Sequence, residues 1–139
     1  MNDLLICEGG EAGRAAVWPN DYEICFQNHV HRARLFGGIN PYFAYRFFEK
    51  LNASGEIDLY RKGVGISNMS GKALASILFP VPPLAEQHRI VAKVNELMAL
   101  CDRLEAEQTD AGAAHARLVA TLLGTLTQSA DAAELAANW

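Results

Sequence analysis

The sequence has few cysteines, no long apolar run and no excess of positive charge. The three cysteines, Cys7, Cys25 and Cys101, are widely spaced and include no CxxC pair, which excludes a disulfide scaffold and favours reduced thiols. No apolar run approaches the roughly 20 residues that cross a bilayer, and no basic residue follows Met1 where a signal peptide would carry one. We therefore expect a cytoplasmic protein without a membrane partner.

The net charge becomes informative when the charged residues are counted separately in the two parts of the chain. A net charge of −4 argues against a nucleic-acid binder that is basic throughout. Residues 1–83 carry eight basic and eight acidic side chains, whereas residues 84–139 carry four basic and eight acidic ones. Since 139 residues suffice for one small domain and an appendage, we expect a compact head over 1–83 and a helical tail over 84–139.

Short apolar and alternating runs in the head predict strands. Residues 3–7 form an apolar run that stops at two glycines, and residues 14–18 form a second run that stops at a proline. From residue 22 to residue 36 side chains alternate in character, which predicts one long strand or two strands joined near Asn28. A further strand is predicted at residues 77–79.

Two helices are predicted between these strands. Asn40 and Pro41 provide an N-cap and a first-turn proline, and apolar residues then recur at every fourth position from Phe43 until Ser54. A glycine-punctuated loop over 61–68 leads to a second, short helix that begins at about Ser70. The head therefore mixes strands and helices.

The tail carries the spacing of a coiled coil. After Pro82 and Pro83, with the second at the first helical position, apolar residues recur at alternating steps of four and three, which is the 3.5-residue repeat of a coiled-coil seam. Gly112 costs about 1 kcal/mol inside a helix and could mark a break, although the repeat continues beyond it. A seam of this length needs a partner helix, either the tail folded back after Gly112 or a second chain. Eight of its eleven positions are apolar, and Gln108, His115 and Thr125 are the polar ones. The eleven positions are Ile90, Val94, Leu97, Cys101, Leu104, Gln108, Ala111, His115, Leu118, Leu122 and Thr125.

Two segments together carry a resemblance to a known family. Residues 79–94, FPVPPLAEQHRIVAKV, with their continuation to Asp102, resemble the conserved spacer of the DNA-specificity subunit of type I restriction-modification systems. Segments of the head resemble the later part of a target-recognition domain of that family. These segments are residues 3–6, 13–14, 26–34 and 63–70.

The resemblance implies an α+β fold, in which a small mixed α/β recognition head precedes a long C-terminal coiled-coil helix. It implies sequence-specific binding of double-stranded DNA at one half of a bipartite site, without catalysis, cofactor or metal. The partners it implies are the methyltransferase subunits and, through them, the restriction and translocase subunit. Because a complete subunit of this family has two recognition domains and two spacers, we expect either a fragment or a naturally short product, whose recognition domain over 1–83 is incomplete at its N-terminus.

Candidate residues for reading DNA bases lie on the predicted strand over 22–36. Arg32 and Arg34 share one face beside Asn28. A guanidinium can bind guanine through two hydrogen bonds, and an amide can bind adenine in the same way. The alternative is that these arginines are solvated surface residues.

Further candidates lie in loops and near the short helix. Arg61 and Lys62, before the glycine-rich segment, could hold backbone phosphates, which position a protein without specifying sequence; a solvated turn is the alternative. Arg14 follows the first glycine-rich turn and could either contact DNA or fix that turn. The other candidates are Ser67, Asn68 and Lys72.

Other functions have weaker support in the sequence. Asn40-Pro41-Tyr42-Phe43 is similar to a motif of DNA adenine methyltransferases but lacks its second proline, so an N-cap is the preferred reading. Cys25 and the histidines that follow it would extend over about 20 Å along a strand, too far to share one metal ion. The remaining rival is a coiled-coil assembly module whose head does not bind DNA, with self-association through the helix.

Overall fold

The computed structural model describes residues 2–63 and 67–137, with side chains up to residue 127. It divides into two compact units, Met1–Val94 and Asn95–Trp139. The first unit contains the mixed head and the first turns of a long helix, and the second continues that helix. The predicted fold class, a small mixed α/β head followed by a long C-terminal helix, is confirmed.

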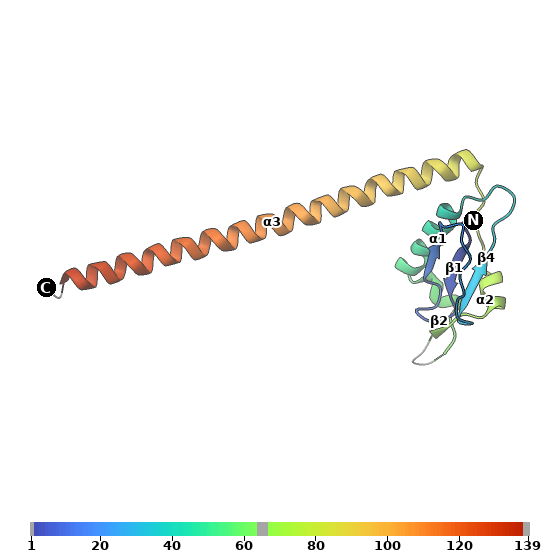
Figure 1. Cartoon of the computed structure of the whole chain (residues 1–139), viewed down its shortest axis with the longest axis horizontal. Helices are drawn as coiled ribbons and strands as arrows, with labels where there is room; N and C mark the ends of the chain where they lie inside the picture. Colours follow the sequence, from blue (N-terminus) through green and yellow to red (C-terminus); the bar gives the residue numbers. More distant parts are fainter. Residues whose placement is uncertain (1, 64–66, 138–139) are drawn as a thin grey trace. The chain divides into compact units, whose positions relative to one another are not determined.

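A three-stranded antiparallel sheet forms the middle of the head. β1 (Leu4–Cys7) lies between β3 (Ala15–Val17) and β4 (Val30–Ala33), as Figure 1 shows in part. The register sets Leu5 opposite Ala16 on one side and Arg32 on the other. Because side chains alternate along a strand, Leu4 and Ile6 are buried on the inner face while Leu5 and Arg32 lie on the outer face.

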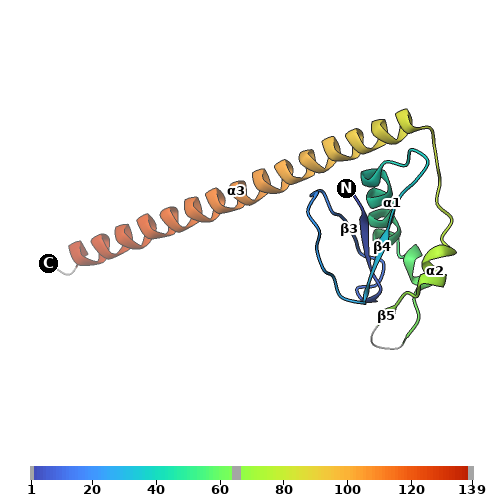
Figure 2. The ribbon, with the colours of Figure 1, turned by 45° about the vertical axis from the view of Figure 1, so that its right-hand side comes forward.

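A second, two-stranded sheet follows β1 directly. β2 (Gly9–Gly10) pairs antiparallel with β5 (Ser67–Asn68). The backbone N–H of Met69 donates to Glu8 O at 2.7 Å, and His31 Nε2 donates to Met69 O at 2.8 Å, so this small sheet is tied to β4. In both ribbon views it lies at the end of the head remote from the N-terminus (Figures 1 and 2).

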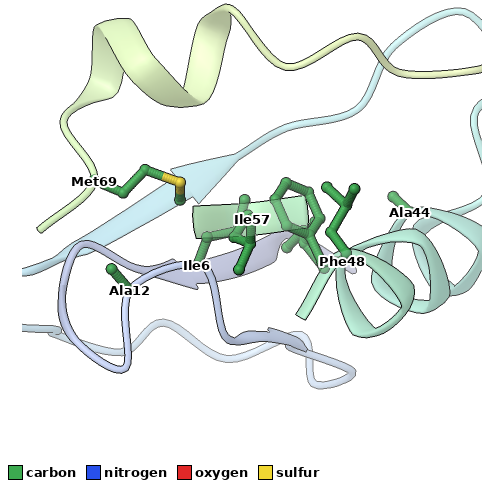
Figure 3. Packing of buried hydrophobic residues seen from close by; sticks show 8 residues of the cluster. Ile6, Ala12, Ala44, Phe48, Ile57 and Met69 are labelled. Carbon is green, nitrogen blue, oxygen red and sulfur yellow. The ribbon is translucent and has the colours of Figure 1, made fainter. Parts of the chain in front are cut away.

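One helix covers the inner face of the three-stranded sheet. α1 (Pro41–Ala53) begins as predicted, with Asn40 Oδ1 accepting from the Tyr42 N–H at 2.8 Å. Its apolar face packs with Ile6 and with Ile57, which comes from a 3₁₀ helix, η1 (Glu56–Tyr60), that was not predicted (Figure 3). The buried cluster comprises Leu4, Ile6, Ala12, Ala44, Phe48, Leu51, Ile57 and Met69.

Gly13 shows why glycine is needed in the turn between β2 and β3. Its φ of +88° is one that L-residues rarely adopt. A Cβ at this position would also lie 2.5 Å from Cγ1 of the buried Ile57. The turn can therefore close over η1 only with glycine at this position.

Two predicted strands need correction. The strand expected over 22–36 is limited to β4, because residues 23–27 are irregular and residues 28–29 form a turn. The strand expected at 77–79 is absent from the described head, and this prediction was wrong. The Phe79 ring instead meets the rings of Phe43 and Phe47 edge-on, at centroid distances of 5.8 and 5.0 Å. Residues 77–79 are therefore held by the packing of Phe79 against α1 and not by pairing with another strand.

The two remaining helices begin close to where the sequence predicts. α2 (Gly71–Ala75) is capped by Ser70, whose hydroxyl accepts from the Ala73 N–H at 3.3 Å. α3 (Leu84–Ala137) begins one residue after Pro83, so that proline is the residue before the helix rather than its first residue. α3 continues through Gly112, so neither the break nor the fold-back considered there occurs. No helix in the described part of the chain combines the length and apolarity needed to cross a membrane.

Candidate nucleic-acid interface

The outer face of the three-stranded sheet carries the two arginines expected to read bases. Asp3 Oδ2 lies 3.4 Å from Arg34 Nε and 3.8 Å from Arg32 Nε, so one carboxylate holds both side chains side by side. Both arginine side chains are exposed, at 46% for Arg32 and 60% for Arg34. Because both pairs use Nε, an end-on contact through the Nη atoms would not compete with them.

An aromatic loop borders the same face and encloses a hollow of about 420 Å³ beside the arginines. The Trp18 ring meets the Tyr22 ring edge-on at 5.2 Å, and Trp18 Nε1 donates to Tyr22 O at 3.3 Å, which holds the start of the loop. Tyr22 and Phe26 remain 60% and 42% exposed. Exposed rings beside guanidinium groups provide stacking and hydrogen-bonding surfaces for bases.

The charge of this hollow is mixed. Its lining contains Arg32 and Arg34 but also Asp3, Asp21 and Glu23, which makes two cations against three acids. Such a surface does not attract phosphates strongly, because non-specific affinity for DNA grows with the number of phosphates that are neutralised. A surface of mixed charge suits hydrogen bonds to particular base atoms better than general electrostatic attraction to the DNA backbone. The sequence signal for the hollow is the group of aromatic and apolar residues at 18–26, most of which the alternating pattern assigned to the strand predicted over 22–36.

Three other candidates gather at the two-stranded sheet. The backbones of Lys62 and Asn68 exchange two hydrogen bonds of 2.8 Å, and Ser67 Oγ donates to Gly10 O. Lys62 and Asn68 are exposed. Lys72 is exposed in the first turn of α2, where it was expected, but α2 has only five residues and so little helix dipole to hold a phosphate.

The structure does not bring all nine candidates into one patch. Arg32 and Arg34 lie beside Asp3, before β1, whereas Ser67 pairs with Gly10, after β1. At about 3.3 Å per residue, residues 3–10 would span roughly 20 Å if they were fully extended, so the two groups lie towards opposite ends of β1. Asn28 lies in the turn before β4 and Arg34 follows β4, so these two are also at opposite ends of a strand.

Arg61 is held by internal partners. Its Nε donates to Ala12 O, one Nη donates to Asp58 Oδ1 and the other donates to Asn52 Oδ1, each at 2.7 Å. Asn52 also donates to Gly13 O at 2.8 Å. The guanidinium thereby links α1, η1 and the turn that precedes β3.

Arg14 lies in that turn and is paired locally. Its guanidinium donates to the Glu11 carboxylate, and this hydrogen bond raises the pKa of Arg14. Both side chains are 72% exposed. Among the side chains that the structure describes, no three His, Cys, Asp or Glu residues form a group that could hold a metal ion.

The fold defines a class of architecture: a small mixed α/β head followed by a long C-terminal helix. A family model for the type I restriction modification DNA specificity domain matches residues 1–111. The chain belongs to this family, as the resemblance indicated.

Three relatives, all from Escherichia coli, are specificity subunits of type I restriction enzymes. Those of EcoAI and EcoEI are each 53% identical over 60 residues, which cover 43% of this chain and 10% of the relative. That of EcoBI is 27% identical over 139 residues, covering 99% of this chain and 28% of the relative. The chain thus spans at most about 28% of the length of these relatives. No solved structure gives a significant match.

Proposed function

We propose that this chain is a DNA-recognition component of a type I restriction-modification system. Residues 1–83 would recognise one half of a bipartite site, and residues 84–139 would form the spacer. The observation that carries the proposal is the family match over residues 1–111 together with the paired, exposed Arg32 and Arg34 beside an aromatic hollow. The relatives' names support the same role.

In this proposal the candidate residues have different tasks. Arg32 and Arg34 contact base edges, since a guanidinium can bind guanine bidentately. Asn28 contacts a base further along the site, and Lys62 and Lys72 contact phosphates, which position the head without reading sequence. Arg61 maintains the structure of the head, because its three donor groups already bind protein oxygens. The remaining candidates are Arg14, Ser67 and Asn68, which we assign to the edge of the interface.

The helix is proposed to serve assembly. Large apolar side chains along its seam are exposed in the single chain, among them Leu97, Leu104 and Leu118 at 48%, 53% and 57%. Such a stripe fits a partner helix. We propose that paired helices separate two half-sites and dock the methyltransferase subunits, which in turn bring the restriction and translocase subunit. The chain itself would have no catalytic role and would act in the cytoplasm.

A second candidate function is supported by the same exposed seam. If assembly is the whole function, the head contributes no DNA contact and the helix alone is the working part. The mixed charge of the hollow and the neutral head favour this alternative more than a basic surface would. The two functions differ in what the arginine pair does, so mutation of that pair distinguishes them.

The test replaces both arginines in the complex with methyltransferase subunits. Arg32→Ala with Arg34→Ala should weaken retention of specific DNA at least about tenfold, since a bidentate base contact is worth roughly 1–3 kcal/mol. Arg46→Ala with Lys50→Ala removes the same charge from α1, outside the candidate interface and the spacer, and should leave retention unchanged. Circular dichroism checks that both variants fold. Equal DNA retention by the two double variants would contradict the proposed reading role and favour the assembly function.

A further inference from the structure

A buried glutamine lies where the head meets the start of α3. Gln87 is 1% exposed and, with Asn40, is one of two buried polar side chains among the described residues. Its Oε1 accepts from the Asn40 backbone N–H at 2.8 Å, and its Nε2 donates to Pro82 O at 2.8 Å. Both ends of the amide are therefore satisfied, as a buried polar group requires.

Asn40 connects the start of α3 to the start of α1. Its Oδ1 caps the helix by accepting from the Tyr42 N–H, and its Nδ2 lies 3.0 Å from His88 Nδ1. Because an amide nitrogen only donates, His88 Nδ1 is the acceptor. One asparagine thus begins α1 and bonds to two successive residues in the first turns of α3, although 47 and 48 positions separate them in sequence.

The chemistry of this arrangement requires an amide at position 87. The side chain must accept at one end and donate at the other, and glutamine does both. A glutamate would turn a second acceptor toward Pro82 O, and a methionine would leave the Asn40 N–H without its partner. Since an unsatisfied buried donor is costlier than a lost surface contact, the arrangement distinguishes glutamine from residues of similar size.

We propose that Asn40, Pro82, Gln87 and His88 form a joint that fixes the first turns of α3 on the head, with Gln87 as its positioning residue. All four lie within the compact unit Met1–Val94. The joint holds residues 84–94 at a defined angle to α1. Its consequence for function rests on the proposed function: the angle at which the spacer leaves the head would set the separation of the half-sites that the assembly accepts.

The test measures the distance between α1 and the start of α3 with spin labels. Ala53→Cys and Ala92→Cys provide two exposed positions in the full chain, after Cys7, Cys25 and Cys101 are replaced by serine. An excess of unlabelled chain suppresses distances between chains. One narrow distance peak is expected, and Gln87→Met should lose it. Glu86→Gln is the matched control, since Glu86 pairs with Arg89 outside the joint, and it should keep the peak.

The same narrow peak in Gln87→Met would overturn the proposal. If Gln87→Met does not fold, hydrogen exchange on the wild-type chain decides instead. The Asn40 amide should then exchange as slowly as amides inside α1, and exchange at the rate of an exposed loop would overturn the joint. Neither measurement involves DNA. Failure to retain DNA would therefore contradict the proposed function and leave the joint unaffected.

The proposed role of the joint in setting the separation of the half-sites has a separate test, in the complex with methyltransferase subunits. Targets with half-sites at different separations should be discriminated by the wild type, and Gln87→Met should lose this discrimination while keeping its affinity for a single half-site. A merely structural role would lower affinity for every target equally, and that result would overturn the spacing role.

Discussion

Arg61 illustrates how internal partners compete with nucleic acid for a guanidinium. In the sequence it stands beside Lys62 before a glycine-rich segment, which is the context of a phosphate contact. In the structure its three donor groups bind Ala12 O, Asp58 Oδ1 and Asn52 Oδ1. Asp58 is only three residues away in sequence, but Ala12 is 49 residues away, so no local pattern could have indicated the contact with Ala12.

The first prediction follows from these three bonds. Arg61→Met should lower the free energy of unfolding by about 2–3 kcal/mol, because three charge-assisted hydrogen bonds are lost and the half-buried acceptors Ala12 O and Asn52 Oδ1 lose their donor. Arg61→Lys should recover only part of this loss, since an ammonium cannot match the fork geometry. Lys62→Met is the neighbouring control and should change stability by no more than about 0.5 kcal/mol. Denaturant unfolding measures all three.

Equal stability of Arg61→Met and the wild type, combined with weaker DNA retention in the complex, would contradict the structural role. It would return Arg61 to the phosphate contacts that the sequence suggested.

Elements with strong local signals were predictable from the sequence. The caps at Asn40 and Ser70 gave the starts of α1 and α2, and the apolar run at 4–7 gave β1. Elements that depend on distant partners were not. The run at 77–79 has the composition of a strand, yet Phe79 packs on α1 instead, and η1 has no repeat long enough to detect.

The candidate site, like the fold, was predictable from the sequence only where the signal is local. The shared face of Arg32 and Arg34 follows from the two-residue period of a strand. The position of Asp3 between them does not, because it depends on the register of β1 against β4. The hollow depends on how residues 18–26 turn back over the sheet, which no local pattern determines.

The continuity of α3 leads to a prediction for Gly112. The residue lies inside an unbroken helix, and a Cβ there would meet nothing within 4 Å. Gly112→Ala should therefore raise the helix's stability by about 1 kcal/mol, since alanine has the higher helix propensity. Thermal melting followed by far-ultraviolet circular dichroism measures the effect. Gly10→Ala is an informative contrast, because its φ of +74° should make the same substitution destabilising.

A lower melting temperature of Gly112→Ala would contradict a continuous helix and favour a functional bend at that residue.

At the scale of the whole molecule, the net charge averages two unlike parts. The entire −4 belongs to residues 84–139, while residues 1–83 are neutral. A neutral head offers little general attraction to DNA, so tight binding would have to come from the assembled complex. In the proposed function, assembly would depend on the seam of α3, whose leucines are exposed in the single chain.

The last prediction tests that dependence by unfolding at different protein concentrations. The helical signal should melt at higher temperature as concentration rises, because association stabilises the folded helix by mass action. The Trp18 signal should change much less, since the head has its own core. Leu97→Asp with Leu104→Asp should abolish the concentration dependence, by burying charge in the seam. Tryptophan fluorescence isolates the head when Trp139 is replaced by phenylalanine.

The control places the same charges on the other side of the helix. Ala99→Asp with Ala106→Asp lies outside the seam positions and should leave the concentration dependence in place. If both double variants and the wild type melt independently of concentration, the seam does not join copies of this chain, and its partner is a helix outside residues 1–139. If both double variants lose the concentration dependence equally, association responds to added charge anywhere on the helix. The predicted coiled-coil register is then wrong.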